Sequence, residues 1–192
     1  MTTASSRPQW FALTVKPNHE KSAAKALESK AVEVFLPLYR ARRRWSDRIK
    51  ELDLPLFAGY VLCRYAAPER ARVLATPGVT SVVGFGNKPA AVPEAQIESV
   101  RTMVSSGVAL SPWPFLRVGE RVRIEAGPLS GVEGILTQVK DAWRVVVTVE
   151  LLQRSVAAEV ERDVVAVASR GAPRERGRTD RERPPGSPHA GL

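Results

Sequence analysis

The stretch Leu54-Pro-Leu-Phe-Ala-Gly-Tyr-Val-Leu-Cys63 carries no charge and is rich in aromatic, aliphatic and β-branched residues. This composition predicts a strand in the middle of a sheet. Side chains alternate along a strand, so Phe57 and Cys63 are expected on one face, with Tyr60 and Leu62 on the other. Both faces are apolar. An apolar face without a cover is typical of a docking site, and the alternative is a strand buried on both sides.

The length and composition of the chain limit the class of protein to which it can belong. With 192 residues it can form one domain or two small ones. No apolar run is long enough to cross a bilayer, and the start Met-Thr-Thr-Ala-Ser-Ser-Arg-Pro lacks the apolar segment of a secretory signal. The single cysteine, Cys63, excludes an intrachain disulfide. These features predict a cytoplasmic protein that binds no membrane.

The chain is strongly basic, with a net charge of +9 and a pI near 10.3. Residues 1–53 hold eleven Lys and Arg against six acids, and residues 169–192 hold six Arg against three acids. Such a balance favours a polyanionic partner, of which nucleic acid is the most common.

Periodicity along the first hundred residues alternates between strand and helix patterns. The order β-α-β-β-α-β-α indicates an antiparallel sheet with its helices on one side. In the first helix, Asn18 is a good N-cap and Glu20 complements the helix dipole. Strands are expected at 10–15, 32–39, 54–63 and 79–85, and helices at 18–31, 68–74 and 93–104.

Residues 40–50 are expected to form a basic loop with a tryptophan inside it. Cationic side chains beside an aromatic ring suit phosphate contact combined with base stacking. The loop therefore predicts nucleic-acid contact. The alternative is a solvated hairpin between two strands.

After about residue 105, the secondary-structure pattern of the sequence changes. Periodicity stops between Ser105 and Pro114, which predicts a linker. Short strands then follow one another closely, as in a small closed or nearly closed barrel. These strands are expected at 121–124, 132–139, 143–150, 155–160 and 164–167. The predicted divisions are 1–8 disordered, 9–106 first domain, 107–115 linker, 116–168 barrel and 169–192 disordered basic tail.

Two separated motifs resemble a known family. Trp10-Phe-Ala-Leu, Pro55-Leu-Phe-Ala-Gly-Tyr-Val-Leu and Thr76-Pro-Gly-Val-Thr-Ser-Val-Val-Gly84 resemble the N-terminal domain of the NusG transcription factors. Val118-Gly-Glu-Arg-Val-Arg-Ile with Gly127-Pro-Leu-Ser-Gly-Val-Glu-Gly-Ile is similar to their C-terminal KOW motif. The fold class implied is α+β, with a four-stranded antiparallel NGN-like sheet and helices, a linker, and a five-stranded SH3-like KOW barrel.

Three further segments are similar to the specialised UpxY-type, RfaH-like antiterminators: Phe35-Leu-Pro-Leu-Tyr39, Pro112-Trp-Pro114 and Leu151-Leu-Gln-Arg-Ser155. This resemblance implies an operon-specific antiterminator. A general NusG-type elongation factor is the first alternative, and a ribosome-associated KOW protein that binds RNA is the second.

The resemblance implies that the first domain grips the β′ clamp helices of RNA polymerase through a hydrophobic pocket on its sheet. A second anchor, on the β subunit, matches Arg70 and Arg72. The factor would keep the polymerase clamp closed and so modulate pausing and termination. The clamp-binding positions are Phe57, Tyr60, Leu62, Phe85, Ile97 and Val100.

Other contacts follow from the same resemblance. The partner nucleic acid is non-template DNA or nascent RNA, and the candidate contacts are Lys16, Lys21, Lys25, Arg43 and Arg44. For the three lysines the alternative is a solvated helix face. The KOW barrel would recruit ribosomal protein S10 or Rho through the segment with Leu151, Leu152 and Arg154. The protein is expected to act as a monomer.

The residues do not favour an enzyme. The only histidines are His19, beside a helix start, and His189, in the tail, with no cysteine cluster to complete a metal site. The glycines of 127–134 do not follow a strand and open a helix, as a phosphate-binding loop would. We expect no catalysis, no cofactor and no metal.

Overall fold

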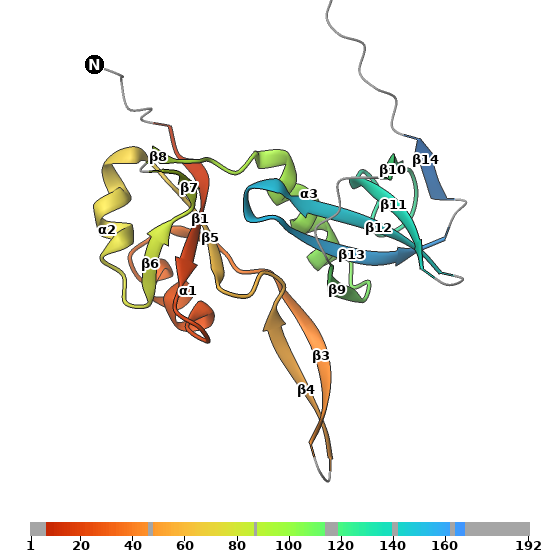
Figure 1. The fold of residues 1–192 in the computed structure, drawn as a ribbon, viewed down its shortest axis with the longest axis horizontal. Helices are drawn as coiled ribbons and strands as arrows, with labels where there is room; N and C mark the ends of the chain where they lie inside the picture. Colours follow the sequence, from red (N-terminus) through yellow and green to blue (C-terminus); the bar gives the residue numbers. More distant parts are fainter. Residues whose placement is uncertain are drawn as a thin grey trace, which may run out of the picture.

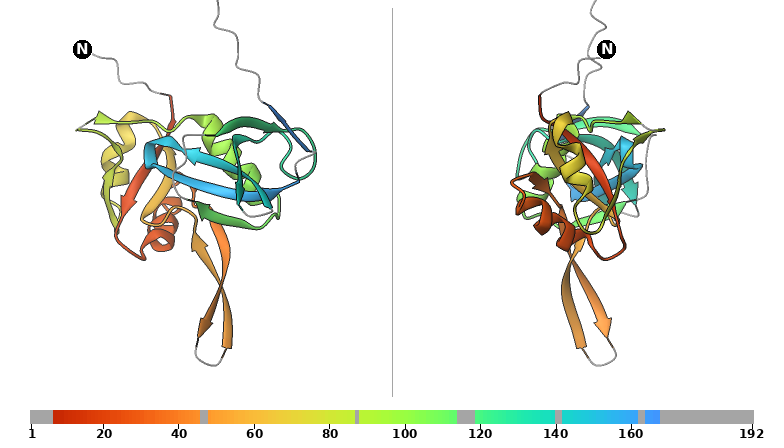
Figure 2. Two further views of the ribbon diagram at one scale, coloured as in Figure 1. Left: turned by 45° about the vertical axis from the view of Figure 1, so that its right-hand side comes forward. Right: turned by 90° about the vertical axis from the view of Figure 1, so that its left-hand side faces the viewer.

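The computed structural model describes two domains that lie side by side and a hairpin that projects away from both (Figures 1 and 2). The predicted disorder at 1–8 and 169–192 falls almost wholly outside the described part. The backbone is described for residues 7–45, 48–86, 88–113, 119–139, 142–161 and 164–167, and the side chains for these residues except 43–45, 48–49, 139 and 167.

The first domain contains the predicted four-stranded antiparallel sheet, in the order β2-β5-β1-β6. Its elements follow the predicted sequence of strands and helices. They are β1 (Gln9–Val15), α1 (Glu20–Glu28), β2 (Glu33–Phe35), β5 (Tyr60–Tyr65), the 3₁₀ turn η1 (Ala67–Glu69), α2 (Arg70–Leu74), β6 (Val79–Val82), the short pair β7 (Gly84–Phe85) and β8 (Lys88–Pro89), and α3 (Glu94–Ser105).

Helices cover both faces of this sheet, so the prediction that they lie on one side is wrong. On one face, α1 and α2 pack against the odd-numbered positions of β1 and β5, such as Leu13 and Val61. On the other face, α3 packs in a cluster with Trp10 and Leu62. The physical reason is that β1 and β5 are apolar on both faces, and each face needs its own cover.

The predicted strand 54–63 is wrong in its first half. The chain leaves the strand β4 (Arg48–Pro55) at Pro55, turns through residues 56–59, and enters β5 only at Tyr60. Gly59 has φ +84°, which only glycine adopts without strain. Because the turn resets the alternation, Phe57 joins the cluster of Leu62 instead of the opposite face.

The predicted basic loop 40–50 is wrong, and the alternative of a hairpin is correct. The strand β3 (Leu38–Trp45) pairs with β4 from Leu38↔Pro55 to Trp45↔Arg48. Cross-strand pairs of opposite charge stabilise this arginine-rich strand. Arg42 and Glu51, for example, form an ion pair of 2.9 Å.

The second domain contains the predicted barrel strands in antiparallel order, which confirms the α+β fold class. Its sheet runs β14-β10-β11-β12-β13-β9. Here the prediction of an irregular linker is wrong for four residues, because β9 (Leu110–Trp113) pairs with β13. The domain boundaries remain a prediction. The other strands are β10 (Glu120–Ile124), β11 (Glu133–Val139), β12 (Ala142–Val149), β13 (Arg154–Val160) and β14 (Val165–Val167), with the 3₁₀ turn η2 (Glu150–Leu152) between β12 and β13.

The two domains touch through α3. This helix packs against β12, and the backbone N–H of Glu150 donates to the Gln96 side-chain oxygen at 3.3 Å. Buried residues of α3, such as Met103, and of the barrel, such as Val149, belong to one continuous apolar cluster. The barrel therefore covers one side of α3.

Candidate docking site

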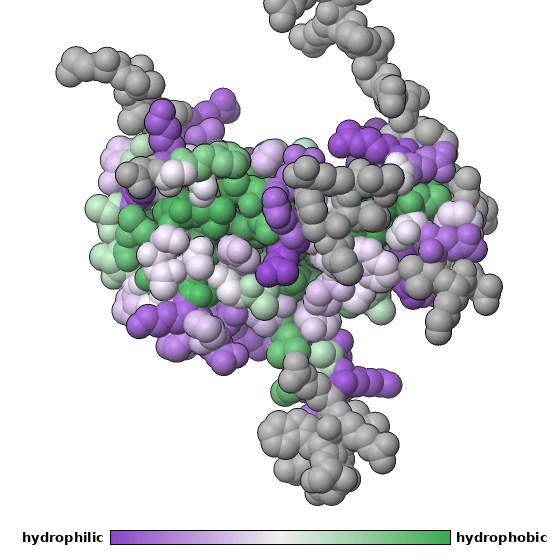
Figure 3. All heavy atoms as spheres, viewed as in Figure 1, coloured by the Kyte–Doolittle hydropathy of each residue, from purple (hydrophilic) through white to green (hydrophobic). Residues whose placement is uncertain are grey.

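Part of the sheet face that carries α3 remains uncovered. Tyr60 and Val83 are half-buried there, and Phe85, in the separate β7–β8 pair that follows β6, is 78% exposed. Phe85 is the one large apolar side chain that is exposed in the described part of the chain. Figure 3 shows apolar side chains gathered on the first domain, over the region where β1, β6 and β7 lie in Figure 1. We call Tyr60, Val83 and Phe85 the open face.

The position of Tyr60 is set by the turn that precedes it. Its backbone N–H donates to the Phe57 carbonyl at 3.0 Å, and the Gly59 carbonyl accepts from the Val15 N–H at 2.9 Å. The Gly59 N–H donates to Oε1 of Glu20 at 2.8 Å, and Glu20 is only 8% exposed. The sequence predicts only a helix-dipole role for Glu20, because a contact across 39 residues leaves no signal in the local sequence.

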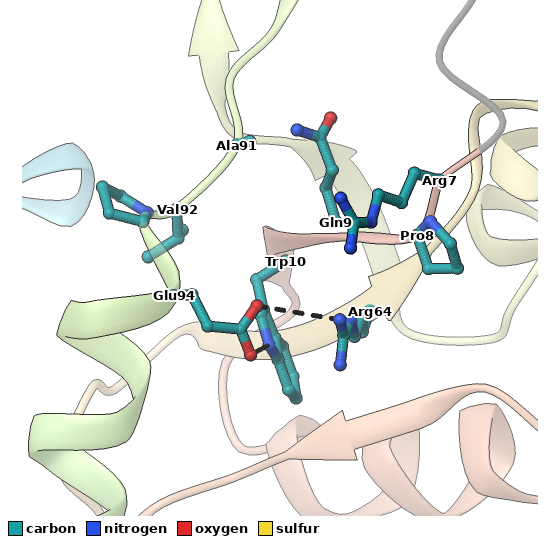
Figure 4. Close-up of a pocket in the computed structure, with 9 residues that line it drawn as sticks. Arg7, Pro8, Gln9, Trp10, Arg64, Ala91, Val92 and Glu94 are labelled. Atoms are coloured by element: carbon teal, nitrogen blue, oxygen red, sulfur yellow. Dashed lines mark hydrogen bonds and ion pairs between the residues drawn. The ribbon is translucent and has the colours of Figure 1, made fainter.

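The α3 helix is fastened to the sheet at its first turn (Figure 4). The Trp10 indole N–H donates to Glu94 at 3.1 Å, and the Arg64 guanidinium lies 3.8 Å from the same carboxylate. Further along α3, Arg101 lies over the Trp10 and Phe35 rings at 5.6 and 5.2 Å. Such cation–π contacts add to the apolar packing. The helix is thus a fixed layer of the first domain.

This layer buries four of the six predicted clamp-binding residues. The apolar stripe of α3, with Ile97 and Val100, packs inward, which is the ordinary role of such a stripe. Only Tyr60 and Phe85 among the six reach the surface. The exposed fractions are 2% for Phe57, 1% for Leu62, and 0% for Ile97 and Val100.

Comparison with known proteins now assigns the fold. Residues 8–101 match the family model described as transcription termination factor nusG. Over residues 8–101, this chain is similar to the NusG family. NusG-family proteins are transcription factors and not enzymes, as the sequence analysis predicts.

Relatives and a solved structure agree with this family. The chain is 27% identical to the transcription termination/antitermination protein NusG of Lactococcus lactis over 165 residues, which cover 79% of this chain and 89% of the relative. It is 24% identical to NusG of Pseudomonas aeruginosa over 167 residues, 80% of this chain and 94% of the relative. A structure described as domain interaction in Thermotoga maritima NusG matches with a TM-score of 0.52 and 18% identity, over 83% and 96% of the two chains. At that identity the likeness shows the fold.

The predicted second anchor lies apart from the open face. Arg70 and Arg72 are exposed on α2, which packs on the opposite face of the sheet from Tyr60. Arg72 is paired with Glu69 at 2.6 Å. The geometry does not bring this anchor and the open face of the NusG-type domain together.

The predicted nucleic-acid contacts fall into two groups. Lys16, Lys21 and Lys25 are exposed on α1 and just before it, on the side of the sheet away from Tyr60. Arg43 and Arg44 belong to β3, and their side chains lie outside the described residues. The two groups therefore belong to different elements.

The predicted barrel contacts lie where the two domains meet. Leu152 is 5% exposed and Leu151 is half-buried, both against the cluster that contains α3. Arg154, at the start of β13, is exposed. The residue before this segment, Glu150, is hydrogen-bonded to Gln96 of α3, so the segment lies next to the NusG-type domain.

The described residues offer little reactive chemistry. Burial raises the pKa of the Cys63 thiol to about 12, and burial together with the neighbouring Cys63 raises the pKa of Tyr65 to about 12. A thiol with so high a pKa is a poor nucleophile. No group of His, Cys, Asp and Glu in the described ranges could hold a metal ion. In the same ranges, no helix is long and apolar enough to span a membrane.

Proposed function

We propose that the open face of the NusG-type domain docks on the β′ clamp helices of RNA polymerase. The observation that carries the proposal is the uncovered apolar surface of Tyr60, Val83 and Phe85 beside a sheet whose other face is sealed. Exposed apolar surface is costly unless a partner covers it. Leu62, Ile97 and Val100 support the shape of this face from below.

The effect on transcription would follow from binding one polymerase conformation better than another. A factor that binds the closed, elongating clamp more tightly shifts the population toward it by that difference in affinity. Pausing and termination would then change without any chemical step by the factor. The proposed site of action is the cytoplasm.

We further infer that the barrel must move for full engagement. It covers one side of α3, and Glu150, which directly precedes Leu151 and Leu152, is hydrogen-bonded to Gln96 of α3. Separation of the domains would expose both surfaces at once. The barrel could then bind ribosomal protein S10 or Rho, and the similarity to UpxY-type antiterminators favours an operon-specific role.

A transcription assay on a template with a strong pause tests the docking. We expect the wild-type protein to change the pause lifetime, and the Tyr60→Ala variant to leave it unchanged. Lys88→Ala is the matched control, because Lys88 is exposed beside the open face without belonging to it. Equal activity of Tyr60→Ala and wild type would contradict the proposal.

Co-purification separates this function from a ribosomal one. The proposed function predicts that tagged protein captures the β′ subunit, and that Tyr60→Ala removes the capture. Capture of large ribosomal subunits, unchanged by Tyr60→Ala, would instead favour a KOW protein that binds RNA.

A further inference from the structure

The barrel has a pocket on the side away from the first domain. The turn η2 before β13 lies beside α3, and β13 runs from there to the far side of the barrel, where β14 follows it (Figure 1). The pocket lies at this far end and has a volume of about 270 Å³. We call this hollow, which is lined by Ile124, Leu129 and Val164 among others, the barrel pocket. It is a separate surface from the proposed S10 or Rho segment, 151–154, which lies at the opposite end of β13.

The lining of the barrel pocket is largely apolar. Ile124 and Leu129 line it and are almost completely buried. Val108, Val160 and Val164 also line it, and these three valines are only half-buried. Burial of apolar surface stabilises a protein, and the described residues leave the burial of the valines incomplete. The pocket can therefore take the apolar groups of a further segment.

Acidic side chains accompany this apolar lining. Glu159 and Glu161 line the pocket, and Glu125 directly precedes Ala126 in its wall. All three glutamates are exposed, and Glu159 forms an ion pair with Arg144 at 3.3 Å. Among the described residues, Glu125 and Glu161 have no cationic partner. On a chain with a net charge of +9, this pocket is suited to a segment that is both basic and apolar.

The chain carries a segment of this chemistry close to the pocket. Residues 169–192, which lie outside the described part, hold six Arg against three acids and are rich in proline. They follow β14, in which Val165 pairs with Ile124 of the pocket. Since an extended chain covers about 3.3 Å per residue, this tail begins within about 15 Å of Val165 and can itself span up to about 80 Å. Its length therefore allows it to turn back onto the barrel.

We propose that the tail, residues 169–192, binds the barrel pocket of its own chain. Its arginines would pair with the three glutamates, and its proline and alanine side chains would cover the three valines. Exposed ion pairs are individually weak, but the tether holds the tail at an effective concentration on the order of a millimolar, so weak pairing is sufficient. A basic segment of another protein would reach the pocket only by displacing the tail. The inference goes beyond polymerase docking and does not rest on it.

Paramagnetic relaxation measured by NMR on the full chain tests the contact. The label is a nitroxide on Thr179→Cys, in the middle of the tail, and Cys63 does not compete for it because its side chain is completely buried. We expect the label to broaden the amide signal of Val164 in the pocket more than that of Val122, which pairs with Val167 just before the tail. Salt at about 0.5 M should remove this difference, because it screens the ion pairs. Broadening centred on Val122 would indicate a free tail and would overturn the proposal.

Substitution of acidic residues separates this contact from net charge. The pocket variant neutralises the three glutamates, and the matched control neutralises three exposed acids elsewhere. The two variants are Glu125→Gln/Glu159→Gln/Glu161→Gln and Glu28→Gln/Glu98→Gln/Glu150→Gln. We expect the pocket variant to lose the broadening at Val164 and the control to keep it. Equal behaviour of the two variants would contradict binding at the pocket.

The tail added as a separate peptide tests the same site from outside. The probe is a fluorescein-labelled peptide of residues 169–192, added to the wild-type chain and to a full chain with its six tail arginines changed to glutamine. We expect at least about fivefold tighter binding to that variant, because its own tail no longer competes for the pocket. The pocket substitutions, added to that variant, should abolish the gain. A gain that survives them, equal affinity for both chains, or no binding to either would rule out the tail as the occupant.

Discussion

The same strands of the first domain present two apolar faces with different fates. Under α1 and α2, Leu13 and Val61 are completely buried. On the other face α3 stops short, and Tyr60 and Phe85 reach the surface. The two faces have similar composition. They differ in how completely helices cover them. A sealed face adds to stability, whereas an open face lowers it and is explained by a partner.

The largest effect on stability should come from the sealed face. Leu27 on α1 is 0% exposed. Leu27→Ala should lower the free energy of unfolding by about 2–5 kcal/mol, because it leaves a cavity in a close-packed cluster. Urea unfolding measures this. A loss below about 1 kcal/mol would show that the sealed face is not a packed core.

The turn that positions Tyr60 should be next. Glu20→Ala removes the acceptor of the Gly59 N–H and leaves a partly buried donor unpaired, which should cost about 1 kcal/mol. Glu28→Ala is the matched control, since Glu28 is exposed on the same helix. Glu20→Gln should retain part of the stability, because an amide oxygen can still accept. Equal effects of Glu20→Ala and Glu28→Ala on stability would mean that the hydrogen bond between Glu20 and Gly59 does not stabilise the turn.

Alkaline pH should weaken the sealed face selectively. The pKa of Cys63 and the pKa of Tyr65 are both raised to about 12 by burial, so the folded state holds protons that the unfolded chain releases. Stability is therefore complete below the unfolded pKa values, near 9 for Cys63 and 10 for Tyr65, and is lost as the pH rises toward 12. Each group contributes a slope of about 1.4 kcal/mol per pH unit in its window.

Urea unfolding between pH 8 and pH 11 measures this loss. Cys63→Ala should be less stable at neutral pH and should show a shallower decline. A variant with the same slope as wild type would contradict the role assigned to Cys63.

The smallest effect on stability should come from the open face. Phe85→Ser changes a side chain that is 78% exposed and should alter the free energy of unfolding by no more than about 0.5 kcal/mol. Thermal unfolding measures this. A clear destabilisation would mean that Phe85 belongs to a packed core.

Local patterns in the sequence predicted most elements. The alternation of Trp10 to Val15, the stripe of Ile97 and Val100 on α3, and the short barrel strands all appear where expected. These signals lie within a few residues of each other, so periodicity can detect them. The resemblance to the NusG family then supplied the arrangement of the first domain.

Long-range contacts could not be predicted in this way. The Glu20–Gly59 bond spans 39 residues, and the burial of Leu62 depends on how α3 crosses the sheet. The hairpin did leave a signal that local periodicity ignores. Arg40 and Arg42 mirror Glu51 and Asp53 around its tip, and matching charges in this way would have predicted the pairing.

One measurement tests the central claim most directly. It compares the affinity of purified core RNA polymerase for two labelled variants, Tyr60→Ala/Phe85→Ser and Leu27→Ala, with its affinity for the wild-type protein. The temperature is chosen so that both variants are folded. The account predicts that the open-face variant binds at least about tenfold more weakly, a change of about 1.4 kcal/mol, while Leu27→Ala binds like wild type despite its lower stability. Wild-type affinity in the open-face variant would contradict the account.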